Sequence, residues 1–140
     1  MELGYAGDVS PTEAWQKLAT DPRAVLVDVR TQAEWSYVGL PDLGALGKPV
    51  HKLAWQIFPQ MQINADFLDG VKAAGIAPDQ PILLLCRSGV RSAAAAKLLT
   101  QQGFGACYNI RDGFEGATDA DKHRGRVAGW KVEGLPWVQG

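Results

Sequence analysis

The stretch ILLLCRSGVRSAAAAKLL, residues 82–99, places a thiol at the junction of two kinds of sequence. The apolar run before Cys86 is typical of a buried strand, and the small residues after it are typical of a helix. Arg87 and Arg91 flank the sulfur. Because cysteines beside cationic side chains at the start of a helix ionise readily, residues 86–91 are candidates for nucleophilic chemistry.

A strand that leads into a helix at Cys86 would create an anion site. Backbone N–H groups in the first turn of a helix lack intrahelical acceptors, and the helix dipole adds partial positive charge there. The residues that supply these amides are Arg87, Ser88, Gly89, Val90 and Arg91. Gly89 gives the backbone freedom to curl toward one point. We expect these amides to stabilise a thiolate, a persulfide or a bound oxyanion; alternatively, Cys86 is a small core residue that closes a strand.

The rest of the chain predicts the elements that hold this junction. Apolar runs at 24–30, 81–86 and 106–110 indicate buried strands, and 50–55 indicates a further short strand. Capping boxes at 10–13 and 31–34 predict helix starts. Further helices are expected from Asn64 to about Ala74 and from about Val90 to Gln102, each followed by a glycine, and 37–49 is expected to be a loop.

Strands that alternate with helices indicate an α/β fold with a mainly parallel sheet. Ligands bind such sheets at the carboxyl ends of the strands, where Cys86 and Asp28 are both expected.

Composition limits the classes of function. The chain has 140 residues, enough for one domain with a core, and a net charge of −1, so no global field favours nucleic acid or a membrane surface. No apolar run is long enough to span a bilayer, and the start lacks the pattern of a secretory signal. Two cysteines and two histidines, scattered along the chain, make neither a disulfide framework nor a metal site, and we expect a reducing, cytoplasmic location.

Three motifs in this order, VLVDVRTQAEW, LLLCRSGVRSAAAAKLL and YNIRDGFEG, followed by GWKVEGLPW, resemble those of a single-domain rhodanese. The resemblance runs from about Val9 to Trp137 and implies one rhodanese domain over residues 1–140, with a core of about 9–137. It implies a central, mainly parallel sheet of about five strands with helices on both faces.

The resemblance also implies the chemistry of a thiosulfate sulfurtransferase. Cys86 would take sulfur from thiosulfate or a similar small anionic donor, carry it as a persulfide, and pass it to cyanide or a thiol, with no metal and no cofactor. Arg87 and Arg91 would help to hold the donor, and the active-site loop would be residues 86–91. For Arg91 the alternative is a structural ion pair with an acid such as Asp28.

Other residues have a functional and a structural interpretation. In the resembled family the Asp28-x-Arg30 element braces the active-site loop; otherwise Asp28 caps a helix and Arg30 lies on the surface. Glu34 is expected to be a capping-box residue. Cys107 is either a resolving thiol or core packing, and packing is favoured. The basic segment 122–126 is either a solvated loop or a rim that steers anions or a partner toward Cys86.

Three alternatives to thiosulfate chemistry stay open. The first is a sulfur-carrier or interaction module that hands its persulfide sulfur to a protein partner. The others are an arsenate reductase and a phosphatase. The loop from Cys86 to Arg91 has six residues, whereas related phosphatases of this fold have seven, so a phosphatase is disfavoured.

Overall fold

The computed structural model describes residues 4–57, 62–118, 120–124 and 128–139. In this part of the chain, five strands form a central sheet in the order β1-β8-β7-β2-β4, and every neighbouring pair is parallel. In sheet order the strands are β1 (Gly7–Val9), β8 (Cys107–Ile110), β7 (Ile82–Leu85), β2 (Val25–Asp28) and β4 (Val50–Lys52). Their carboxyl ends therefore lie along one edge of the sheet.

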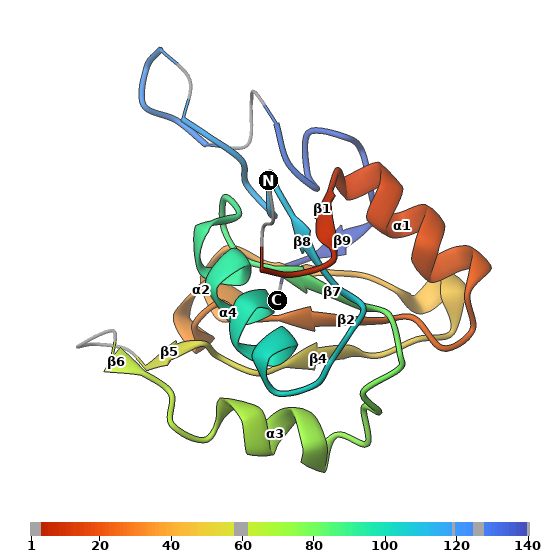
Figure 1. Ribbon diagram of the computed structural model, residues 1–140. Helices are drawn as coiled ribbons and strands as arrows, with labels where there is room; N and C mark the ends of the chain where they lie inside the picture. The colour runs from red at the N-terminus through yellow and green to blue at the C-terminus, as the bar shows by residue number, and fades with distance from the viewer. Residues whose placement is uncertain (1–3, 58–61, 119, 125–127, 140) are drawn as a thin grey trace.

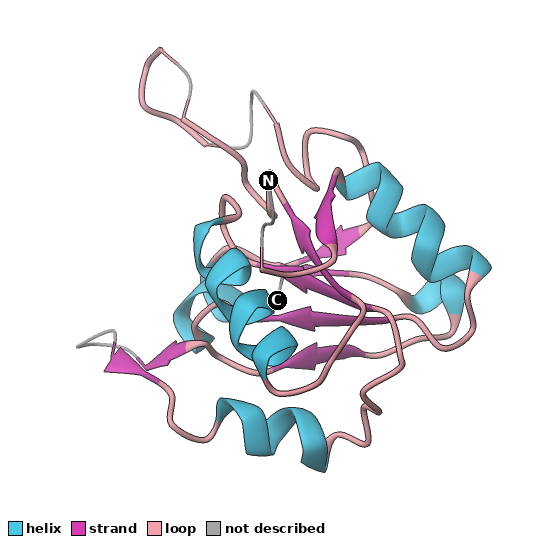
Figure 2. Cartoon of the chain, viewed as in Figure 1, coloured by secondary structure: helices cyan, strands magenta, loops and turns pink. Residues whose placement is uncertain are grey.

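Helices cover both faces of this sheet (Figures 1 and 2). The helices are α1 (Pro11–Thr20), α2 (Gln32–Tyr37), α3 (Phe67–Ala73) and α4 (Val90–Gln101), with a 3₁₀ turn at Gly44–Leu46. One core cluster contains residues of α3 and α4, and the other contains residues of α1 together with Phe114 and Trp130.

Strand β7 shows how sequence alternation divides the two cores. All four of its residues are buried, as expected for a central strand of a parallel sheet. Ile82 and Leu84 belong to the cluster under α3 and α4, and Leu83 and Leu85 belong to the cluster under α1. Cys86 continues this alternation and falls on the side of α4, so the sulfur lies on the face from which the next helix starts.

Two small antiparallel pairs extend the core domain. Strand β3 (Leu40–Pro41) pairs with β9 (Trp137–Val138), so the C-terminal segment is attached to the segment that follows α2. Strand β5 (Gln56–Ile57) pairs with β6 (Gln62–Ile63) and forms a projection beside α3 (Figure 1).

The fold class predicted from the sequence is confirmed, and so are both capping boxes. Ser10 with Glu13 starts α1, and Thr31 with Glu34 starts α2, with reciprocal side-chain to backbone hydrogen bonds in each. In the described residues, no helix is both long and apolar enough to cross a membrane.

Two local expectations were wrong, and one strand was not predicted. Asn64 does not cap α3: its Oδ1 accepts a hydrogen bond from the N–H of Asp66, and the helix begins at Phe67. The expected loop at 37–49 contains β3 and the 3₁₀ turn. Strand β1 was not anticipated, because its three residues carry no apolar run.

Candidate active site

Cys86 lies directly after β7 at the carboxyl edge of the sheet and is only 1% exposed. It is nevertheless one of the residues that line a pocket of about 360 Å³. The other lining residues are Glu34, Gln56, Arg87, Ser88, Val90 and Arg91. The sulfur is therefore sheltered by the protein but faces a space that a small molecule can enter.

The backbone after Cys86 turns the amide of Gly89 toward the sulfur. The N–H of Gly89 donates a hydrogen bond to Cys86 Sγ, with a distance of 3.1 Å between nitrogen and sulfur. Gly89 is the N-cap of α4 and has a φ of 102°, a conformation that glycine adopts without strain. No side chain of the described residues caps α4 by a hydrogen bond, so the cap leaves the first-turn amides of this helix without a side-chain acceptor.

A second loop, residues 113–116, is hydrogen-bonded to the backbone of the cysteine loop, residues 86–91. The N–H of Phe114 donates to the carbonyl of Cys86 at 2.8 Å, and the N–H groups of Glu115 and Gly116 donate to the carbonyl of Arg87 at 3.0 and 3.1 Å. Because the N–H and C=O groups of a peptide unit point in opposite directions, carbonyls that are held by the second loop leave the amides of the first free to face the sulfur.

Gly113 makes this close approach of two backbones feasible. A Cβ atom at this position would lie 2.4 Å from the carbonyl oxygen of Cys86, and its φ of 64° is in the left-handed region. The turn at residues 112–116 therefore packs directly against the backbone of the cysteine loop.

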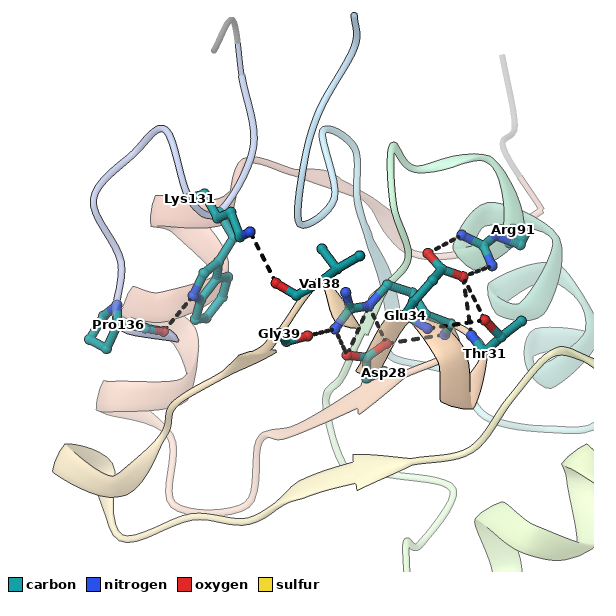
Figure 3. A network of polar contacts seen from close by, with 10 residues as sticks. Asp28, Thr31, Glu34, Val38, Gly39, Arg91, Lys131 and Pro136 are labelled. Atoms are coloured by element: carbon teal, nitrogen blue, oxygen red, sulfur yellow. Dashed lines mark hydrogen bonds and ion pairs between the residues drawn. The ribbon is translucent and has the colours of Figure 1, made fainter. Parts of the chain in front are cut away.

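Arg91 and Glu34 form an ion pair at the pocket wall. Arg91 Nη1 lies 2.6 Å from Glu34 Oε1, and Nη2 lies 2.9 Å from Oε2, so the contact is bidentate (Figure 3). Burial acts to raise the pKa of Glu34, but the hydrogen bonds and charge of Arg91 outweigh it and hold that pKa below its ordinary value. The partner of Arg91 is thus Glu34 and not Asp28, and Glu34 has two roles, since it also caps α2.

Asp28 and Arg30 form a second, fully buried ion pair beneath the loop. Arg30 Nη2 lies 2.7 Å from Asp28 Oδ2 and also donates to the carbonyl of Gly39 at 2.8 Å. The guanidinium carbon of Arg30 lies 4.3 Å from the ring centroid of Phe114, whose N–H holds the carbonyl of Cys86. The structure therefore connects Arg30 to the loop through a stacked ring, and the surface position considered for Arg30 was wrong.

Cys107 lies far from Cys86. In the parallel register Cys107 faces Ile82, four residues before Cys86, so the two cysteines are about 13 Å apart along the strand direction. Cys107 is fully buried, and burial raises its pKa to about 11. These properties fit core packing and not a resolving thiol.

The basic segment is only partly described, and Arg126 lies outside the described residues. Arg124 Nη1 donates to the carbonyl of Gly116 at 2.7 Å, so this side chain supports the turn behind the cysteine loop. Sequence reasoning did not single out Gln56 as a lining residue, since it lies in the short strand β5 and no local pattern marks it.

Comparison with known proteins identifies the family. The family model described as "STR4 middle domain" matches residues 6–140. The chain belongs to this family, and it is a rhodanese-like domain. The rhodanese-like domain of the Anabaena protein Alr3790 has the same fold, with a TM-score of 0.64 at 16% identity, and covers the whole of this chain and 81% of its own.

Nearer relatives align over almost their whole length. The crystal structure of Rv0390 from M. tuberculosis is 48% identical, with a TM-score of 0.89, over 97% of this chain and 99% of that one. The Rickettsia conorii protein named Uncharacterized protein RC0915 is 41% identical over 133 residues, 93% of this chain and 95% of its own. A sulfurtransferase of Allochromatium vinosum is 31% identical over 123 residues, 88% of this chain and 86% of its own.

We predict that Gly113→Ala destabilises this rhodanese-like domain more than Gly134→Ala does. Both glycines have a positive φ, at 64° and 77°, so each alanine should cost about 1–2 kcal/mol of backbone strain. A Cβ at Gly134 meets no described atom within 4 Å, whereas at Gly113 it meets the carbonyl of Cys86. The displaced loop should cost at least about 2 kcal/mol more, measured by urea unfolding. Equal losses would show that the two loops are not in tight contact.

We also predict a pH-dependent effect of Glu34→Gln. A carboxyl whose pKa is lowered in the folded state adds stability above its unfolded pKa, and this stability is lost as the pH falls through the folded pKa. Glu34→Gln should therefore cost about 1–2 kcal/mol near pH 7. The difference from the unmodified chain should shrink as the pH falls below the ordinary value of 4.5.

The matched control for this prediction is the same substitution in an Arg91→Gln background. There Glu34→Gln should show little pH dependence, since the partner that lowers the pKa of Glu34 is gone. Urea unfolding at several pH values measures both. A stability difference that does not change with pH would contradict the ion pair as described.

Proposed function

We propose that this rhodanese-like domain is a sulfurtransferase that moves sulfane sulfur from thiosulfate or a similar anionic donor to a thiophilic acceptor, through a persulfide on Cys86. The observation that carries the proposal is the sulfur of Cys86 at the wall of a pocket, with the N–H of Gly89 donating to it at the uncapped start of α4. The relationship to sulfurtransferases supports the same class of reaction.

In the first half-reaction the thiol of Cys86 loses its proton to solvent, and the thiolate attacks the outer sulfur of the donor. The S–S bond to Cys86 forms while the bond to the sulfonate sulfur breaks, and sulfite leaves with that electron pair. Negative charge stays close to Sγ throughout, so the Gly89 amide and the positive end of the α4 dipole stabilise every stage.

In the second half-reaction an acceptor attacks the outer sulfur of the persulfide. Attack by cyanide would give thiocyanate, and attack by a thiolate would give a new persulfide on the acceptor. In both cases the electron pair of the broken S–S bond returns to Cys86. The sequence of two displacements at one sulfur requires no redox partner and predicts ping-pong kinetics.

The charges around the pocket favour anion binding by backbone amides and by Arg87. Arg91 is already bound on two nitrogens by Glu34, so its charge is largely neutralised. Arg87 lines the same pocket and is exposed to solvent. A transferring phosphoryl group needs cations on its three oxygens, and the engagement of Arg91 with Glu34 speaks against that chemistry.

The direct test is the persulfide itself. After incubation with thiosulfate, mass spectrometry should find one added sulfur, about 32 Da, on the peptide that contains Cys86. Cys86→Ser should lose both this adduct and the formation of thiocyanate, while Cys107→Ser should keep both. An adduct that survives in Cys86→Ser, or that resides on Cys107, would overturn the proposal.

A second test concerns the donor. Arg87→Ala should raise the KM for thiosulfate by about threefold to tenfold, because an exposed cation at the pocket attracts a small anion through modest, screened charge interactions. Added salt should reduce the difference. Lys72→Ala, which removes an exposed cation on α3, is the matched control and should leave the KM unchanged. Equal effects of the two variants would exclude a specific role for Arg87.

A further inference from the structure

Ser92 is fully buried in the first turn of α4 and has two acceptors within reach. Its Oγ lies 3.2 Å from Cys86 Sγ and 2.5 Å from Asn109 Oδ1. A hydroxyl carries a single hydrogen, so Ser92 can donate to only one of these atoms at a time. The choice determines whether the sulfur of Cys86 faces a hydrogen or the lone pairs of the Ser92 oxygen.

Asp8, which is exposed, determines the direction of the Ser92 hydrogen bond through Asn109. Asn109 Nδ2 donates to Asp8 Oδ1 at 3.0 Å, and a carboxylate can only accept, so the amide of Asn109 is turned with its oxygen toward Ser92. That oxygen can also only accept. The hydroxyl hydrogen of Ser92 therefore points to Asn109, and its lone pairs face Cys86.

Tyr5 completes the chain of contacts. Its hydroxyl donates to the same oxygen of Asp8 at 2.7 Å. Burial, together with the hydrogen bond and charge of Asp8, raises the pKa of Tyr5 to about 12, so this group stays a donor at neutral pH. Every link from Tyr5 and Asp8 to Asn109 and Ser92 thus has a defined direction.

We infer that Asp8, acting through Asn109, holds the hydroxyl hydrogen of Ser92 away from Cys86, so that the network favours the thiol and restrains its conversion to the reactive thiolate. In the thiol, S–H donates to Ser92 Oγ, and each member of the chain has its partner. When the thiol releases its proton to solvent, Ser92 must rotate its hydrogen from Asn109 to the sulfur. This leaves the side-chain oxygen of Asn109 without its donor, and because Asn109 is only 4% exposed, that loss opposes ionisation.

Ser92, Asn109 and Asp8 are positioning residues in this scheme. The inference deepens the proposed function, since it takes Cys86 as the nucleophile, but it concerns ionisation alone and needs no sulfur donor. Because a thiol is oxidised less readily than a thiolate, the restraint would also slow the oxidation of Cys86.

The charged groups of the surrounding elements are constant among the variants proposed below. Arg91 of α4 interacts electrostatically with Cys86, and Arg87 and Glu34 line the same pocket. Asp28 and Arg30 form their buried pair on β2 and its extension, and after β8 Arg111 Nη1 lies 3.8 Å from Oε1 of Glu13 on α1.

The test measures the pH dependence of Cys86 alkylation by iodoacetamide, located by mass spectrometry. Asp8→Ala frees the amide of Asn109 to turn over, so that its N–H donates to Ser92 Oγ and the Ser92 hydrogen moves to Sγ. The pH midpoint of alkylation should fall, and the rate below that midpoint should rise about fivefold, the size expected for one hydrogen bond gained by the thiolate. Asp8 is exposed, so the variant should keep the fold.

Two further variants separate the hydrogen-bond chain from the simple loss of a negative charge. Asp8→Asn is equally neutral, but its amide oxygen can still accept from Asn109, so it should alkylate like the unmodified chain. In a Ser92→Ala background, Asp8→Ala should have no effect. The inference is overturned if Asp8→Ala leaves alkylation unchanged, if Asp8→Asn matches Asp8→Ala, or if the effect persists without Ser92.

The result is independent of sulfur transfer. Failure to form a persulfide would contradict the proposed function, but the alkylation profiles would still test the inference about Asp8. Unchanged profiles alongside normal persulfide formation would sink only the inference about Asp8.

Discussion

The contact between the backbones of residues 86–87 and 113–116 is the constraint on which the site depends. The carbonyls of Cys86 and Arg87 are bound by amides of the second loop, so the peptide units that follow these two residues keep their orientation without help from any ligand. A side chain at Gly113 would not permit this contact. A neighbouring approach is equally close, since a Cβ at Gly89 would lie 2.1 Å from the carbonyl oxygen of Arg111. Preorganised dipoles of this kind need not rearrange when charge develops at the sulfur.

Two ion pairs lie in the polar region around the cysteine loop. The buried pair of Asp28 and Arg30 supports the second loop through Phe114, and the half-buried pair of Glu34 and Arg91 forms part of the pocket wall. Each pair cancels its own charge, so under the proposed function an anionic donor would be attracted mainly by backbone amides, the helix dipole and Arg87.

Sequence patterns predicted those parts of the molecule that obey local rules. The apolar runs that became β2, β7 and β8 are buried on both faces, and the two capping boxes depend on residues three positions apart. The position of Cys86 followed from the junction of strand and helix. Long-range pairings could not be predicted from local patterns, because the partners are far apart in the sequence. Arg91 and Glu34 are separated by 57 positions, and Asn109 and Asp8 by 101 positions. Strand β1 escaped for the same reason, since only the edge of β8 makes Gly7–Val9 a strand.

The order of the sheet has a consequence for how the site survives fluctuation. Strand β7 is central and hydrogen-bonded on both sides, by β2 and β8, while β1 and β4 occupy the edges. Fraying begins at such edges and at exposed projections, and the middle of a sheet opens only when the whole domain does. Cys86 directly follows this central strand, so we expect its position to persist when either edge of the sheet unfolds locally.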